Sequence, residues 1–185
     1  MTLEKEASRY VARVLRVAEG QTIRLFDPEH RVEADAFVVA IERTGVRCRI
    51  AEVSAALDTN RRPITVLQAV GKGDKFDAVV RDATELGATQ IVAVETARGV
   101  VRIGDRAEHR LQRWRKIAEE AARQCGRADT PALVGPTPWG DALRGATSEG
   151  SISLCLWERA TDPIGPVLAT LAPMQPVTIA VGSEG

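Results

Sequence analysis

The chain has 185 residues, of which 44% are hydrophobic and only 4% aromatic. Its 25 lysines and arginines balance 25 aspartates and glutamates, so net charge alone does not indicate a polyanionic partner. No apolar run approaches the roughly 20 residues that a membrane span needs, and the charged start Met1–Tyr10 is unlike a secretory signal. We therefore expect a cytoplasmic globular protein with one large domain or two small ones.

Metal and disulfide chemistry find no support in the sequence. Cys48, Cys125 and Cys155 lie far apart and lack the paired spacing of zinc sites or disulfide frameworks. Neither His30 nor His109 lies near a second pair of candidate ligands. We expect no bound metal and three reduced, mostly buried thiols.

The first 60 residues predict a short helix followed by antiparallel strands. The segment Glu4–Val17 places four apolar residues at helical spacing, namely Ala7, Val11, Val14 and Leu15. Three β-branched runs follow it and are separated by turn residues: 22–26, 31–41 and 45–53. This pattern indicates a small antiparallel barrel or sheet, and the polar stretch Asp58–Pro63 is predicted to be a linker.

From Pro63 onward, strands and helices alternate, which predicts an α/β layer fold. Continuous apolar runs, typical of parallel strands covered on both faces, occupy residues 63–70, 90–95, 151–157 and 177–182. The Gly/Pro-rich stretch 135–150 is predicted to be a connector that holds a short helix around Trp139 and Leu143.

Two amphipathic helices are predicted between these strands. The first follows the turn Gly71–Lys75 and ends at Gly87, and its apolar stripe comprises Phe76, Val79, Val80, Ala83 and Leu86. The second covers 106–125 and ends at Gly126, and its buried face comprises Leu111, Trp114, Ala118, Ala121, Ala122 and Cys125.

The turn before the first of these helices has the Gly-x-Gly start of a nucleotide-binding loop. Phe76 stands where a dinucleotide fingerprint needs its third glycine, and the Gly-Lys-Ser/Thr ending of a Walker loop is absent. Lys72 and Lys75 remain beside a helix N-terminus. They either attract a phosphate there or are solvated lysines on a plain turn.

Basic residues gather in two stretches although the total charge cancels. Arg9–Arg16 carries three arginines, and Arg98–Arg127 carries many more. Along the second helix, one face opposite the apolar stripe collects Arg113, Lys116, Glu120, Arg123 and Arg127. These cations either face RNA or interact with the helix dipole, and the sequence leaves both hypotheses open.

Nucleophilic catalysis is not supported. Ser153 and Ser183 lack a Gly-x-Ser-x-Gly context, and the acidic residues mostly alternate with bases on helix surfaces. If the protein is an enzyme, positioning and a reactive cofactor supply the chemistry. No catalytic residue is named from the sequence.

Four segments together resemble the RsmE-type 16S ribosomal RNA uridine-N3 methyltransferases of the SPOUT superfamily. Tyr10–Arg16 is similar to that family's H-x-x-R-V-L-R signature, and Gly71–Val94, followed by Arg98, is similar to its K-x-x-K-x-[DE]-x-x-x-x-K-x-T-E-L-G block. Trp114–Pro131 resembles W-x-x-I-x-x-E-A-x-x-Q-C-x-R-x-x-x-P, and Val181–Gly185 resembles I-G-P-E-G-G. The matches span almost the whole chain in the right order.

This resemblance implies a PUA-like RNA-binding β-barrel over residues 1–60 and a SPOUT α/β methyltransferase domain over 63–185, with a C-terminal trefoil knot. In the family, a further helix and an L-G-x-x-I-L-R-x-E-T-A stretch close the knot and supply a third cofactor loop. We expect that knot-closing segment to be absent from this chain, which stops at Gly185. Tyr10 replaces a frequent histidine and Ser183 the usual proline, and neither change is expected to abolish binding.

The resemblance also implies S-adenosylmethionine as cofactor and a homodimer that methylates N3 of a uridine in 16S ribosomal RNA of the small subunit. The residues expected to bind the cofactor are Leu156, Trp157, Glu158, Val181, Gly182, Glu184 and Gly185. The residues expected to bind RNA are Arg9, Arg13, Arg16, Lys72, Lys75, Arg98, Arg123 and Arg127. Leu154 and Cys155 are expected in the core.

Other functions stay open at this point. The chain could be a noncatalytic RNA-binding module, in which the barrel and the basic helix dock on ribosomal RNA. It could also be a SPOUT methyltransferase that acts on another RNA base. A plain α/β nucleotide-binding protein is disfavoured by the missing phosphate-loop glycines.

Overall fold

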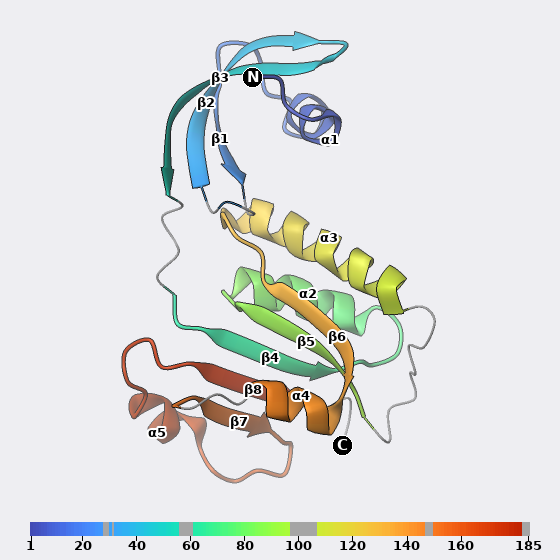
Figure 1. Ribbon diagram of the computed structural model, residues 1–185, viewed down its shortest axis with the longest axis vertical. Helices are drawn as coiled ribbons and strands as arrows, with labels where there is room; N and C mark the ends of the chain where they lie inside the picture. Colours follow the sequence, from blue (N-terminus) through green and yellow to red (C-terminus); the bar gives the residue numbers. More distant parts are fainter. Residues whose placement is uncertain (28–29, 31, 56–60, 97–106, 147–149, 183–185) are drawn as a thin grey trace. The chain divides into compact units, whose positions relative to one another are not determined.

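A computed structural model of the chain describes residues 1–27, 30, 32–55, 61–96, 107–146 and 150–182. The chain divides into two compact units, Met1–Thr59 and Asn60–Gly185, which we call unit 1 and unit 2 (Figure 1). None of the helices in the described ranges combines the length and the apolar character that crossing a bilayer requires.

Unit 1 contains a three-stranded antiparallel sheet, in agreement with the sequence prediction. Its strands pair in the order β1 (Thr22–Asp27), β2 (Val32–Glu42) and β3 (Gly45–Ala55). Side chains alternate along β2, so that Ala36 and Val38 are buried while Phe37 and Val39 are exposed. The buried face of the sheet includes Val46 and Cys48 of β3. It forms one small core with Leu3 and Val11.

The N-terminal helix α1 (Lys5–Arg9) continues into a π-helical turn, η1 (Tyr10–Val14). The predicted short helix is present, and of the four apolar residues at helical spacing Val11 is buried, whereas Ala7, Val14 and Leu15 are exposed. The wider π-turn changes the direction of the side chains that follow it, and strict 3.6-residue periodicity therefore does not hold here.

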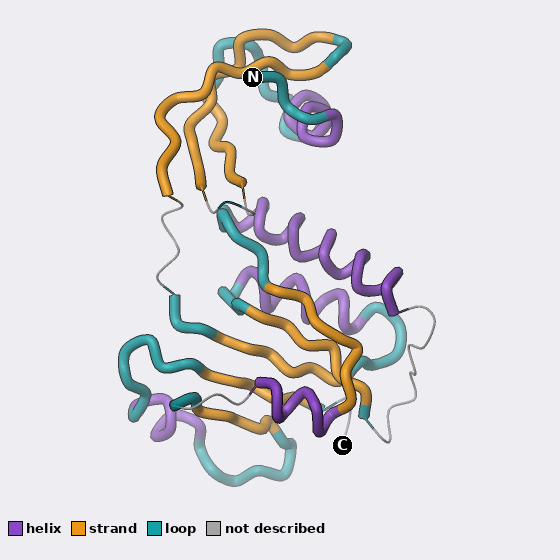
Figure 2. The backbone as a smooth tube through the Cα atoms, viewed as in Figure 1, coloured by secondary structure: helices purple, strands orange, loops and turns teal. Residues whose placement is uncertain are grey.

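Unit 2 is built on a five-stranded parallel sheet (Figure 2), and the predicted α/β architecture is confirmed at this level. The strands lie in the order β6 (Ala132–Pro138), β5 (Gln90–Glu95), β4 (Ile64–Ala69), β8 (Val177–Val181) and β7 (Ile152–Leu156). Every neighbouring pair is parallel. All five carboxyl ends therefore lie on the same side of the sheet. We call this side the carboxyl edge, which differs from the edges formed by the outer strands β6 and β7.

Helices cover both faces of this sheet (Figure 1). On one face, α2 (Lys75–Glu85) and α3 (Ala107–Cys125) pack on Ile91 and Ala93. On the other face, α4 (Trp139–Ala146) packs on Leu67, Val92 and Val94. Because successive side chains of a strand point to opposite faces, β5 contributes to both cores, as its continuous apolar run predicts.

Several details of unit 2 differ from the predictions. Leu86 is 84% exposed, because α2 ends at Glu85 and Gly87, with φ +97°, turns the chain away. Cys125 and Cys155 are exposed as well, so of the three thiols only that of Cys48 is buried, and its burial raises its pKa.

The sequence analysis did not predict strand β6 or helix α5 (Ile164–Ala169). Proline is tolerated in β6 because the strand lies at the sheet edge, where one side of the backbone needs no partner. A Cβ at Gly135 would clash with the carbonyl oxygen of Ala93, so glycine allows β6 to approach β5.

Candidate functional site

The carboxyl ends of β4, β8 and β7 are adjacent. Val181 of β8 pairs with Gln68 of β4 on one side and with Leu156 of β7 on the other. Trp157 and Gly182 follow these paired positions directly, so the two segments leave neighbouring strands at the same edge. Ligands of open parallel sheets bind outside such carboxyl ends.

The Gly182 carbonyl accepts a hydrogen bond from Gln68, and the space beside the Gly182 Cα is open. The amide Nε2 of Gln68 donates to the carbonyl oxygens of Ala69 at 3.1 Å and of Gly182 at 3.4 Å. A Cβ built on Gly182 would meet nothing within 4 Å. The chain therefore leaves space where a ligand can approach the main chain closely.

Two large apolar side chains at this edge are exposed. Leu156 is 48% exposed and Trp157 is 57% exposed, and Glu158 follows them on an exposed turn. Further exposed apolar residues lie in α5 and in the loop that leads into the amino end of β8, namely Ile164, Val167, Leu168 and Met174. Large exposed apolar surface of this kind indicates a binding surface.

The remaining residues predicted here are only partly described. Val181 is half-buried, and Glu184 and Gly185 lie outside the described residues. Leu154 is half-buried, whereas Cys155 is exposed, so its predicted core position is wrong.

Lys72 and Lys75 lie at the same edge of the sheet. They follow β4, whose end pairs with β8, and both are exposed. Gly73, with φ +71°, makes the turn between them. The structure therefore brings these two cations to the edge from which Trp157 and Gly182 leave the sheet.

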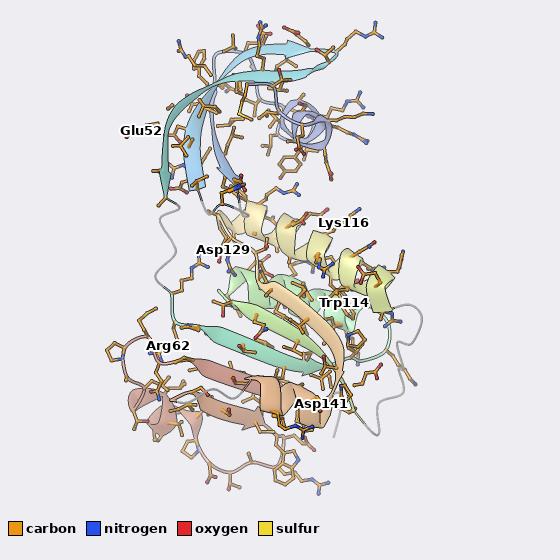
Figure 3. All side chains as sticks on the ribbon, in the orientation of Figure 1. Glu52, Arg62, Trp114, Lys116, Asp129 and Asp141 are labelled. Carbon is orange, nitrogen blue, oxygen red and sulfur yellow. The ribbon has the colours of Figure 1, made fainter. Side chains whose placement is uncertain are left out.

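Arg127 does not face solvent, which corrects its prediction as an RNA-binding residue. Its guanidinium is 4% exposed and donates to the carbonyl oxygens of Thr84 and Ala88 and to both carboxylate oxygens of Asp129. Asp129 is labelled in Figure 3. These acceptors include the Thr84 carbonyl at the C-terminal end of α2, which also accepts from the Gly87 amide at 3.1 Å. Arg127 therefore stabilises the fold.

Two cations of α3 are ion-paired. Arg123 lies 3.8 Å from Glu119, and Arg113 pairs with Asp77 of α2. Lys116, labelled in Figure 3, is exposed on the same helix. RNA binding by Arg123 stays a prediction, and Arg98 lies outside the described residues.

In unit 1, Arg9, Arg13 and Arg16 are all exposed. Arg9 and Arg13 line a groove, and Arg16 lies just beyond η1 with φ +52°. In the described ranges of both units, no three His, Cys, Asp or Glu side chains gather as a metal site requires.

The sequence analysis missed Gln68. A glutamine in the otherwise apolar run Ile64–Ala69 was the available signal, because a polar side chain in a strand covered on both faces needs a partner. Its partner, the Gly182 carbonyl, is 114 residues away, so only the sheet order reveals the pair.

Comparison with known proteins agrees with this geometry. Residues 58–185 match the model of a family described as RNA methyltransferase domain. The chain belongs to this RNA methyltransferase family. A relative, the ribosomal RNA small subunit methyltransferase E of Mycobacterium bovis, is 33% identical over 180 residues, which cover 95% of this chain and 67% of the relative.

Two solved structures of methyltransferases share the fold. Ribosomal RNA small subunit methyltransferase E from Neisseria gonorrhoeae, bound to S-adenosyl methionine, has a TM-score of 0.79 and 26% identity, covering 98% of this chain and 73% of that one. A methyltransferase from Legionella pneumophila, also in complex with this cofactor, has a TM-score of 0.79 and 27% identity, covering 98% and 72%. The family resemblance predicted from the sequence is confirmed.

Proposed function

We propose that this protein transfers a methyl group from S-adenosylmethionine to N3 of a uridine in 16S ribosomal RNA. The names of the relatives and the cofactor bound to the two solved structures support this function. Within the chain, the observation that carries it is the pairing of Leu156 with Val181, because it brings Trp157 and Gly182 to one edge of the sheet.

The residues at this edge fit the cofactor. Open space beside Gly182 admits a ligand against the backbone, and Leu156 and Trp157 offer exposed apolar surface for an adenine ring. Gln68 fixes the Gly182 carbonyl, so the loop begins from a defined position. Together with Glu158, Val181, Glu184 and Gly185, these residues are proposed to form the cofactor site.

Bound S-adenosylmethionine supplies an electrophilic methyl group on a sulfonium. The chain's contribution is to align the uridine with it and to stabilise negative charge at N3 when its proton leaves. Lys72 and Lys75 follow the adjacent strand β4 and supply positive charge at this edge. The proposal assigns them to the RNA, either at its phosphates or near the reacting base.

The proposal extends to the architecture of the family. Unit 1 is proposed to form a PUA-like RNA-binding barrel, and unit 2 a SPOUT domain with a trefoil knot, acting as a homodimer in the cytoplasm without a metal. The antiparallel sheet of unit 1 and the parallel sheet of unit 2 are compatible with this assignment. The homodimer is supported by the exposed Val167 and Leu168 of α5, which a contact between subunits would cover.

Calorimetry with S-adenosylmethionine tests the cofactor site directly. Gly182→Val fills only open space, so we expect unchanged thermal stability and about tenfold or greater loss of affinity, equivalent to about 1.4 kcal/mol or more. Gly145→Val in α4 is the matched control, since a Cβ there also meets nothing within 4 Å, and it should bind normally.

Two outcomes would overturn the proposal. One is no measurable affinity of the unmodified protein for S-adenosylmethionine. The other is a normal uridine-N3 methyl mark in 16S ribosomal RNA from a strain that lacks the gene, because the protein would then modify another base or none.

A further inference from the structure

Unit 1 contains a groove of about 640 Å³ between the α1–η1 helical segment and the turn that joins β2 to β3. Four exposed cationic side chains line it: Lys5, Arg9, Arg13 and Arg43. Lys5 and Arg43 lie outside every motif that the sequence analysis identified. We call these four residues the groove cations.

The groove cations have no partner among the residues that the structure describes. Within the described part of the chain, none of their side chains makes a hydrogen bond or an ion pair. The single carboxylate lining the groove, Glu42, pairs instead with Arg47 at 3.3 Å. Four positive side chains therefore share one concave surface, and their mutual repulsion favours an anion with several charges.

The two walls of the groove are held at a fixed spacing. The Ser8 hydroxyl donates to the Leu3 carbonyl at 2.9 Å and accepts from the Val46 amide at 3.0 Å, which ties α1 to β3. At Gly45, a Cβ would lie only 3.0 Å from the Ser8 hydroxyl oxygen and 3.1 Å from the Thr2 methyl group. Glycine therefore permits this close approach, and the backbone segments that carry the cations are held at this spacing.

The chemistry of the groove favours the RNA backbone over the bases. Its remaining lining is aliphatic or hydroxylic, with Ala12, Ile41 and Val46 among the apolar residues, and it contains no aromatic ring or side-chain amide. Reading bases requires stacking or paired donors and acceptors, whereas contacts to phosphates require only positive charge.

We infer that this groove binds the phosphodiester backbone of RNA through the four groove cations and does not read base sequence. The identity of the polyanion as RNA rests on the proposed function. The groove would hold the substrate through contacts that set its register, while selection of the uridine would depend on other residues.

Salt-dependent binding to a 16S ribosomal RNA fragment tests the inference. For the double variant Arg13→Gln/Arg43→Gln of the full chain, we expect the slope of log affinity against log salt to fall by about 2, since each lost phosphate contact reduces it by about 1. Affinity should fall by roughly tenfold per arginine at 0.1 M salt and by little near 1 M.

Two single variants sharpen the test. Arg24→Gln removes the same charge from the same unit, but Arg24 is paired with Asp35 at 3.2 Å outside the groove, so its slope should not change. Glu42→Gln removes the only groove carboxylate and releases Arg47, so it should tighten RNA binding and steepen the slope.

Several results would overturn the inference. Equal slopes for the double variant and for Arg24→Gln would show that the groove does not contact phosphate. A loss of affinity that depends on the RNA sequence would contradict backbone recognition. Binding to phosphatidylserine vesicles without binding to RNA would assign the groove to a membrane surface.

Calorimetry with S-adenosylmethionine on the same proteins separates the two proposals. Normal cofactor affinity with equal slopes would defeat the groove inference alone. No cofactor affinity with the expected change in slope would defeat the proposed function alone.

Discussion

The groove of unit 1 and the α2–α3 layer of unit 2 are both rich in arginine, yet the arginines have opposite surroundings. Arg9, Arg13 and Arg43 are exposed and have no partner among the described residues. In unit 2, Arg127 is buried among carbonyl and carboxylate oxygens, and Arg113 pairs with Asp77. The comparison shows that the acceptors available nearby, and not the residue type, decide whether an arginine is enclosed in the fold or left exposed.

Arg127 of unit 2 is buried beside two partly exposed side chains, the carboxylate of Asp129 and the guanidinium of Arg61. Asp129 accepts from Arg127 at 3.2 Å and lies 3.9 Å from Arg61. Burial lowers the pKa of Arg61, and the adjacent charge of Arg127 lowers it further. The guanidinium of Arg127 also donates hydrogen bonds to the carbonyl oxygens of Thr84 and Ala88, so all of these partners belong to the protein.

The largest effect is expected at Arg127. Arg127→Met leaves Asp129 and two carbonyls without their buried partner, and we expect a loss of about 3–5 kcal/mol in the free energy of unfolding. Urea denaturation measures this loss. Arg123→Met is the matched control, because it breaks an exposed pair with Glu119 worth about 1 kcal/mol or less.

A loss below about 1 kcal/mol for Arg127→Met would contradict the structural role assigned to this side chain. Because the variant could unfold altogether, Arg127→Lys provides a second reading. It retains the charge but not the planar set of donors, so its stability should lie between those of Arg127→Met and the unmodified protein.

A smaller effect is expected at Asp77, which joins the two helices on one face of the sheet. Asp77 accepts from the Trp114 indole at 3.0 Å as well as from Arg113, and the Trp114 ring packs on Phe76 with 4.3 Å between centroids. Asp77→Ala leaves the buried indole N–H unpaired, so we expect destabilisation by about 2 kcal/mol in urea denaturation.

Asp141→Ala is the control for Asp77→Ala. Asp141, labelled in Figure 3, forms an exposed pair with Arg144 on α4, and its loss should cost about 0.5 kcal/mol or less. Equal costs at the two aspartates would mean that the bond to Trp114 contributes nothing.

The sequence predicted the repeating parts of the fold better than its ends and edges. The apolar runs of β4, β5 and β8 specify strands covered on both faces, and the structure confirms them. Periodicity does not show where an element stops, which is why Leu86 was wrongly assigned to the buried stripe. Strand β6 was missed because its glycine and prolines resemble a loop, and its edge position is a property of the whole sheet.

The candidate site was also only partly predictable, because local sequence signals do not show which distant segments the fold brings together. A strand followed by Gly182 is a local signal, whereas its pairing with β7 depends on strand order. Arg13 and Arg127 look alike in the sequence, because the acceptors Thr84 and Ala88 lie 43 and 39 residues from Arg127. Sequence spacing cannot show that one arginine is enclosed and the other exposed.

The smallest effect on stability is expected in the groove itself. Arg13→Gln and Arg43→Gln break no contact with a described residue and relieve repulsion between like charges, so each should change the free energy of unfolding by about 0.5 kcal/mol or less, with a stabilising sign. Arg24→Gln should have the opposite sign, because it breaks pairs with Asp35 and Glu33.

Urea denaturation at low salt reveals this sign, and added salt should remove it because exposed charges are screened. A cost above about 1 kcal/mol for either groove variant would show that these arginines support the fold, as Arg127 does. Weaker RNA binding together with increased stability would instead show that repulsion between the groove cations costs stability in the free protein, and that a bound polyanion offsets this cost.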